Sequence, residues 1–270
     1  MKREDYVNVL EKMYEEYYTG EGGYCKYFGE CKKGIDEPCK FASDKAMVGE
    51  EYGNSSSVPR IVFVGKEGIH SDEKGKVIKD VYLPERDAPN SHYRGLRYVM
   101  AYLLCGIFEE NKPCDATQKT LNNYSNATKY IALLNFFKCA FGEGTRSLSH
   151  TFSMETKCQE IMLREIEILE PNILVIQVKD RPSKFDETLK NKFGGSLGCI
   201  KLFGDTATGV YQYFLTSGEP FLLIWTYHPA AGPYPSWAND NKNGNVYINK
   251  QLNPVLDKAI EAFKKLKNQT

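Results

Sequence analysis

The chain has 270 residues, of which 41% are apolar and 26% are charged, a composition that is ordinary for a globular protein with its own core. Its 35 basic and 35 acidic residues leave a formal net charge of zero, so nucleic-acid binding would need a local basic patch. No apolar run reaches about 18 residues and the N-terminus lacks a signal-peptide pattern, so we expect a cytoplasmic protein without membrane contact.

The predicted elements alternate between helices and strands along the chain. In order they are a helix at 5–18, an irregular segment rich in Gly, Lys, Ser and Cys at 20–58, a strand at 60–64, a long loop at about 66–92, a helix at 94–108, a strand at 129–137, a helix at 153–169, strands at 172–178 and 220–228, and a helix at 253–268. Such alternation implies a mainly parallel sheet with helices on both faces. We therefore predict an α/β protein, a three-layer α/β/α sandwich around a central, mainly parallel four-stranded sheet. It forms a single domain, 1–270, in which residues 1–58 wrap onto a core of residues 59–270.

Three of the predicted strands end in polar side chains that a core does not need. Glu67 follows the first strand, Asn135 ends the second, and His228 ends the fourth. Each has a structural interpretation of its own: a turn residue, a cap of a buried backbone end, and a core histidine. Because the carboxyl ends of parallel strands meet at one edge of a sheet, their equivalent positions favour a shared site.

Eight cysteines in an intracellular chain indicate metal ligation more than disulfides. Cys25, Cys31 and Cys39 cluster near the N-terminus, in a segment that lacks other signs of regular structure. A metal site would tie this segment to the main domain. Four thiolates suit an iron–sulfur cluster and also suit zinc.

The segments GKEGIH, ALLNFFKC and TYHPA together resemble the uracil-DNA glycosylase superfamily, in the order in which that family carries its motifs. The resemblance covers roughly residues 59–235. It is closest to the iron–sulfur branch, because Cys139 follows the second strand and Cys158 lies in the next helix. The resemblance implies a [4Fe–4S] cluster, with zinc as the less favoured metal. We expect the ligands to be Cys31, Cys39, Cys139 and Cys158, with Cys25 in reserve.

The resemblance also implies a monofunctional DNA glycosylase, which hydrolyses a flipped base and leaves an abasic site. Glu67 would activate water, and His228 would donate to oxygen O2 of the leaving base. The base would be bound by Asn135, Tyr93, Gly65, Gly68, Ile69 and His70. The loop after His228 would enter the duplex, with Tyr234 and Pro229 as the wedge. Candidate phosphate contacts are Lys66, Arg94, Arg97, Lys138 and Arg146, and for each of them a solvated surface position is the alternative.

Two departures from the family pattern bear on the substrate. Lys66 stands where the iron–sulfur branch usually has Glu, and Gly68-Ile69 stands where uracil-specific members block bulky groups at C5 of the base. Two substrates therefore stay open: uracil in DNA, and a C5-modified cytosine such as the glucosylated hydroxymethylcytosine of phage DNA, removed in antiviral defence. A different class also stays open, a module that binds a modified base or a DNA end without cleavage. In each case we expect a monomer whose partner is DNA.

Overall fold

A computed structural model of the chain describes residues 1–20, 25–33, 39–40, 45–65, 91–136, 138, 140–141, 152–177, 185–195, 198–229, 237 and 246–268. The side chains of a few of these residues, Cys39 and Tyr93 among them, are not described. None of the described helices is both long and apolar enough to cross a membrane.

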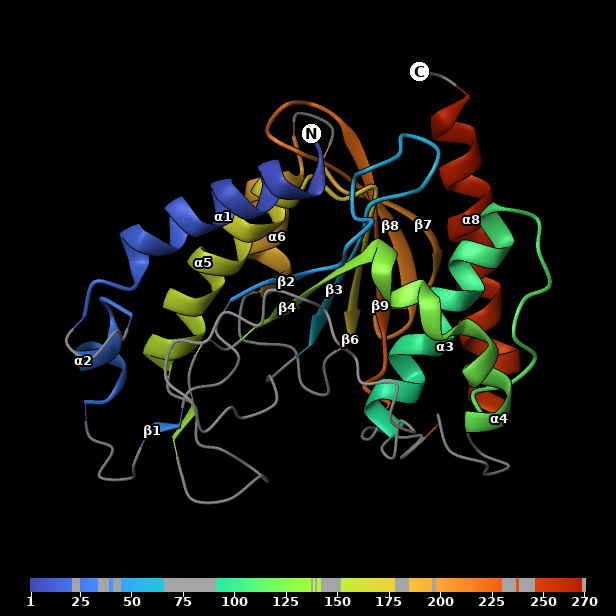
Figure 1. Cartoon of the computed structure of the whole chain (residues 1–270), viewed down its shortest axis with the longest axis horizontal. Helices are drawn as coiled ribbons and strands as arrows, with labels where there is room; N and C mark the ends of the chain where they lie inside the picture. Colours follow the sequence, from blue (N-terminus) through green and yellow to red (C-terminus); the bar gives the residue numbers. More distant parts are fainter. Residues whose placement is uncertain are drawn as a thin grey trace.

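Seven strands in the described part of the chain form one mixed sheet, in the order β2-β4-β3-β6-β9-β8-β7 (Figure 1). The four predicted strands are its parallel centre: β4 (Ile131–Asn135), β3 (Ile61–Gly65), β6 (Ile173–Gln177) and β9 (Pro220–Thr226). Their long apolar runs follow from this position, because a central parallel strand is buried on both faces.

The sheet is larger than the predicted four strands, because three antiparallel strands extend its edges. They are β2 (Met47–Val48) beside β4, β8 (Gly209–Phe214) beside β9, and β7 (Ile200–Gly204) beside β8. These strands lack the signal by which the central ones were recognised. β2 has only two residues, and four of the five residues of the edge strand β7 are exposed. A separate two-stranded sheet joins β1 (Cys39–Lys40) to β5 (Ala140–Phe141).

Helices cover both faces of the sheet, as the alternation of elements predicted (Figure 1). One face carries α1 (Arg3–Tyr17), α5 (Phe152–Leu169) and α6 (Phe185–Phe193), and the short α2 (Phe28–Cys31) lies against α5. The other face carries α3 (Ser91–Ile107), α4 (Gln118–Leu121), the 3-10 helix η2 (Asn122–Tyr130), the π-helical turn η3 (Ile248–Leu252) and α8 (Asn253–Lys267). Each face therefore has its own apolar core, and the three-layer α/β/α arrangement is confirmed.

Two contacts between described elements illustrate how the N-terminal segment joins the rest of the chain. Helix α1 packs on α5, where the Tyr14 hydroxyl donates to Glu165 (2.6 Å) and the Tyr17 hydroxyl donates to Glu160 (2.9 Å). Further along, β2 adds its two residues to the sheet by pairing with β4. These contacts bury tyrosine rings and satisfy their hydroxyl groups at the same time.

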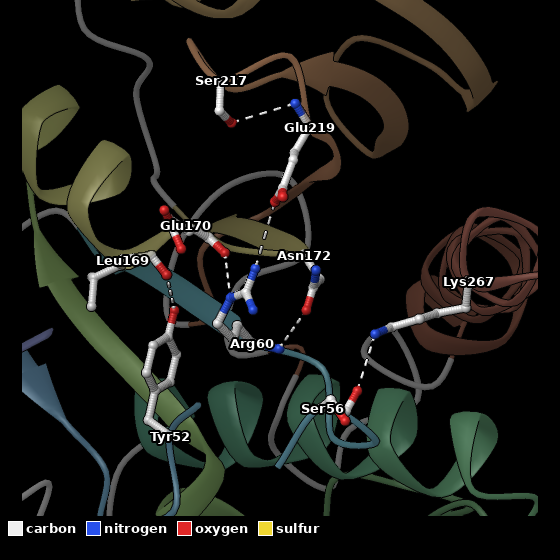
Figure 2. A network of polar contacts seen from close by, with 9 residues as sticks. All are labelled: Tyr52, Ser56, Arg60, Leu169, Glu170, Asn172, Ser217, Glu219 and Lys267. Atoms are coloured by element: carbon white, nitrogen blue, oxygen red, sulfur yellow. Dashed lines mark hydrogen bonds and ion pairs between the residues drawn. The ribbon is translucent and has the colours of Figure 1, made fainter. Parts of the chain in front are cut away.

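The amino ends of the central strands are joined by a polar network around Arg60 (Figure 2). The Arg60 backbone N–H donates to Asn172 Oδ1 (2.9 Å), and its Nε donates to the Glu170 carbonyl oxygen (2.6 Å). Its guanidinium also lies 4.0 Å from the Glu219 carboxylate. One arginine thus links the starts of β3, β6 and β9. The site predicted from the sequence concerns the opposite, carboxyl edge of the sheet.

Candidate functional site

The carboxyl edge of the parallel strands carries a row of four residues in register. Gly65 of β3 lies opposite Asn135 of β4 and opposite Gln177 of β6, and Gln177 lies opposite Thr226 of β9. The Phe136 N–H donates to the Gly65 carbonyl oxygen (2.8 Å), which extends the β3–β4 ladder one residue further. The order across the sheet is therefore Asn135, Gly65, Gln177, Thr226, and His228 follows two residues after the last.

The row faces the layer of α3 and α8. Side chains alternate along a strand, and the residues two positions earlier, Phe63, Val175 and Ile224, belong to the core beneath these helices. Gly65 and Gln177 therefore lie on that same face. Two of the polar members, Gln177 and Thr226, are buried, and Asn135 is half-buried.

The segment that carries His228 is held in place by aromatic side chains. The Tyr227 backbone N–H donates to the Tyr247 hydroxyl (3.1 Å), and the Trp237 indole N–H donates to the Tyr227 carbonyl oxygen (3.1 Å). The rings of Trp237 and Tyr247 pack on each other with their centroids 5.4 Å apart. Burial raises the pKa of the Tyr247 phenol, so the hydroxyl that accepts from the Tyr227 N–H is neutral at neutral pH. His228 itself is half-buried at the end of this braced segment.

The first turns of α3 close against the same segment. A Cβ atom on Gly95 would come within 2.2 Å of Pro229 Cγ, so only glycine allows this approach. Pro229 is buried there. This position speaks against Pro229 as a DNA wedge, because a wedge side chain must be exposed to enter the duplex.

Two arginines on α3 differ in their access to solvent. Arg94 is half-buried, whereas Arg97 is 3% exposed and burial lowers the pKa of its guanidinium. The predicted phosphate contact from Arg97 does not fit this burial. The same holds for Lys138, which is 2% exposed on the opposite face of the sheet. Its ammonium donates to the Glu165 carboxylate, whose Oε1 lies 2.7 Å away, so the predicted phosphate contact from Lys138 is wrong.

Several predicted site residues lie outside the described residues. For Tyr93 the structure places only the backbone, in the first turn of α3. The others are Glu67, Gly68, Ile69, His70 and Tyr234. The predicted phosphate contacts Lys66 and Arg146 also lie outside. Glu67 comes two residues after Gly65 in the sequence.

Three of the predicted cysteine ligands lie near one another on the face of α1 and α5. Cys31 at the end of α2 and Cys158 in α5 are both buried, and Cys25 is half-buried. Burial is the main cause that raises the pKa of the Cys31 thiol to about 12, and the neighbouring thiols Cys158 and Cys25 raise it further. The Lys138 backbone N–H donates to Cys158 Sγ (3.4 Å). This neighbourhood combines thiol donors with an N–H···S hydrogen bond.

The other two predicted ligands are Cys39, in strand β1, and Cys139, just before strand β5, and these two strands pair with each other. In the β1–β5 sheet, Cys39 lies opposite Phe141, and Cys139 comes just before β5 in the sequence. Cys139 and the Cys39 side chain are outside the described residues. Within the described residues, no group of three or more His, Cys, Asp or Glu side chains has a metal-binding arrangement. The ligand set predicted from the sequence therefore includes two side chains, Cys39 and Cys139, that lie outside the described residues.

Sequence reasoning did not single out Gln177, which the structure places in the middle of the row. The signal was present in the run ILVIQ, where an amide replaces an apolar residue at the carboxyl end of a buried strand. Asn135 ends β4 in the same way, at the same register.

No family model matches the chain, and a comparison with curated proteins returned no significant match. A functional conclusion therefore depends on the chemistry and placement of these residues.

Proposed function

We propose that the chain is a DNA glycosylase of the uracil-DNA glycosylase type, which removes a flipped pyrimidine base by hydrolysis. One observation carries the proposal: Asn135 and the segment that ends in His228 lie at the same edge of the sheet as Gly65, two residues before Glu67. These are the three strand ends that the motif resemblance assigns to one active site.

Each of the three residues has a chemical role that fits its type. A glycosidic bond breaks through an oxocarbenium-like sugar, which the negative charge of Glu67 would stabilise while the carboxylate orients water. His228 would donate a hydrogen bond to O2 of the departing base, where negative charge develops. Asn135 offers a donor and an acceptor to the edge of the base, so it suits uracil and cytosine alike. Extraction of the base from the duplex costs a few kcal/mol, which DNA contacts and a wedge such as Tyr234 would offset.

The cysteine neighbourhood supports a [4Fe–4S] cluster as part of the same proposal. The thiols of Cys31 and Cys25 lie near Cys158, and the N–H···S bond from Lys138 is of the kind that surrounds cluster sulfurs. Cys31 and Cys158 come from α2 and α5, so a cluster bound there would link the N-terminal segment to the main sheet. Cys39 and Cys139 would complete the set, with Cys25 as the alternative ligand. The group would act as a structural tie on the sheet face opposite the one to which the row belongs.

The proposed activity is tested with oligonucleotides that carry uracil, hydroxymethylcytosine or glucosylated hydroxymethylcytosine. The wild-type protein is compared with Glu67→Gln, and Glu15→Gln, on the exposed surface of α1, is the matched control. We expect an abasic product from the wild type and from Glu15→Gln, and none from Glu67→Gln. Equal product from wild type and Glu67→Gln would contradict the role of the carboxylate. Binding of one modified base without any cleavage would identify a recognition module instead.

The metal is tested separately, on protein that is purified without oxygen. A [4Fe–4S] cluster predicts a brown solution, iron and sulfide near four per chain, and loss of colour on Cys158→Ser. Cys114→Ser, at an exposed thiol, is the matched control. A colourless protein with stoichiometric zinc would replace the cluster by a zinc site.

A further inference from the structure

Gln177 is a buried side chain whose amide is left without a partner. It is 1% exposed, and neither its Nε2 nor its Oε1 has a hydrogen-bond partner in the described structure. A buried polar group that lacks hydrogen bonds destabilises the folded state, and such groups are rare in folded proteins. Gln177 also lies in the row at the carboxyl edge, where α/β proteins bind ligands.

A glycine separates the two amide residues of the row. Gly65 lies between Asn135 and Gln177, and it contributes no side chain between them. Neighbouring strands lie about 4.8 Å apart, so the backbones of Asn135 and Gln177 are separated by roughly 10 Å. Two amide residues thus flank a glycine at the end of β3, on the sheet face that α3 covers.

We propose that Gln177 is a base-recognition residue that contacts ring nitrogen N3 of the pyrimidine, an assignment that rests on the function proposed above. Across the sheet the polar groups come in the order Asn135, Gln177, His228. Along the pairing edge of a pyrimidine, the polar positions come in the order of the exocyclic group on C4, then N3, then O2. With His228 at O2, the middle amide meets N3 and Asn135 meets the exocyclic group.

A glutamine suits both substrate classes at this position. Its Oε1 accepts the N3–H of uracil, and its Nε2 donates to the N3 lone pair of a cytosine. Rotation of the amide exchanges the two atoms, so Gln177 selects pyrimidines with a polar position 3 and does not separate uracil from modified cytosine. Protein groups that bind a substrate atom in this way reject analogues that lack it, because they are then left unpaired.

The test combines a change in the protein with a change in the base. Gln177→Met keeps the length of the side chain and removes the amide. Gln212→Met, on strand β8 outside the row, is the matched control. Both are made in the Glu67→Gln background, so that binding is measured without cleavage. The probe is a labelled oligonucleotide that carries the preferred base, or its 3-deaza analogue in which a C–H replaces N3.

With Gln177 present, we expect the normal base to bind roughly tenfold or more tightly than the 3-deaza base. This preference should disappear in Gln177→Met and persist in Gln212→Met. The melting temperature of the free Gln177→Met protein should rise by roughly 2–4 °C, because the variant removes an unpaired buried amide. A glutamine that held only protein groups would instead show a lower melting temperature and an unchanged preference.

The outcomes separate this assignment from the proposed function. An unchanged preference for the N3-containing base in Gln177→Met, or no preference in the parent, overturns the role of Gln177 even if the wild type cleaves DNA. Absence of cleavage overturns the glycosylase activity alone, and an N3 preference that depends on Gln177 would still support base recognition. An oligonucleotide that binds without regard to its base overturns the assignment.

Discussion

The ion pair between Lys138 and Glu165 offers the sharpest test of the packing between the sheet and α5. Lys138 is 2% exposed and Glu165 is fully buried, so water solvates neither charge. Both carboxylate oxygens accept from the ammonium, and the Tyr14 hydroxyl adds a hydrogen bond to Oε1 (2.6 Å). The Tyr14 oxygen in turn accepts from the Ala46 backbone N–H (2.6 Å). The pair therefore connects the end of β4, α5, α1 and the chain before β2.

Replacement of Lys138 by methionine leaves the Glu165 carboxylate buried without its counter-charge. Loss of one partner of a buried pair lowers the free energy of unfolding by about 3–5 kcal/mol. We expect the lower end of this range, about 3 kcal/mol, because the Tyr14 hydroxyl still donates to the carboxylate. The double variant Lys138→Met/Glu165→Met removes both charges, and the Tyr14 hydroxyl loses Glu165 as its acceptor. That loss costs about 1 kcal/mol.

Urea unfolding of the wild type, both single variants and the double variant measures this cycle. Lys129→Met is the matched control, because its partner Glu50 is 3.8 Å away and both side chains are about half exposed. The control should change stability by less than about 1 kcal/mol. Iron and zinc are measured in each variant, since Lys138 precedes Cys139 in the sequence. Additive single-variant effects, or a Lys138→Met protein as stable as the wild type, would refute a buried, coupled pair.

Three further predictions concern the described helices and the strand edge. Gly95→Ala should lower the free energy of unfolding, measured by thermal unfolding, by about 1–3 kcal/mol, because the added Cβ would lie 2.2 Å from Pro229 Cγ. Gly29→Ala is the control and should be nearly neutral, because its Cβ would have nothing within 4 Å. At pH 8 iodoacetamide should modify the exposed Cys114 before Cys105, whose pKa is raised by burial and by a nearby glutamate; mass spectrometry that finds the reverse order contradicts this burial. The raised pKa of Tyr247 favours its neutral form in the folded state, so its contribution to folding stability is complete below about pH 10 and is lost as the pH rises further. The melting temperature should therefore fall above pH 10, and an increase there would contradict this prediction.

The centre of the fold was predictable because burial on both faces leaves a direct signal in the sequence. The first strand was expected at 60–64 and is observed at Ile61–Gly65, and the third was expected at 172–178 and is observed at Ile173–Gln177. The short edge strands were not predictable in this way. Four of the five residues of β7 are exposed, so burial leaves little signal in its sequence, and it joins the sheet by pairing with β8.

The candidate site was predictable only as far as chain topology determines it, because parallel strands bring their carboxyl ends together. Asn135 ends β4 at this edge as predicted, whereas β9 ends at Thr226, two residues before the predicted His228. The role of Lys138 was misjudged because its neutralising carboxylate, Glu165, lies 27 residues further on in a helix. From the sequence alone, a lysine near a candidate site is a candidate phosphate contact. Only the packed structure shows that a carboxylate already neutralises its charge. Gln177 was missed for the converse reason, since only the packed structure reveals that its amide is buried without a partner.

The polar groups at the two edges of the parallel sheet differ in their hydrogen bonding. At the amino edge, the polar groups of Arg60 and Asn172 are joined to each other and to the neighbouring backbone (Figure 2). At the carboxyl edge, Gln177 lacks a partner in the described structure, so the free protein is less stable there than its fold allows. A ligand that supplies the missing hydrogen bond binds the folded state alone, and it stabilises the protein in proportion to its occupancy. Removal of the Gln177 amide should therefore stabilise the free protein and weaken the stabilisation by ligand. A purely structural glutamine cannot produce these two changes of opposite sign.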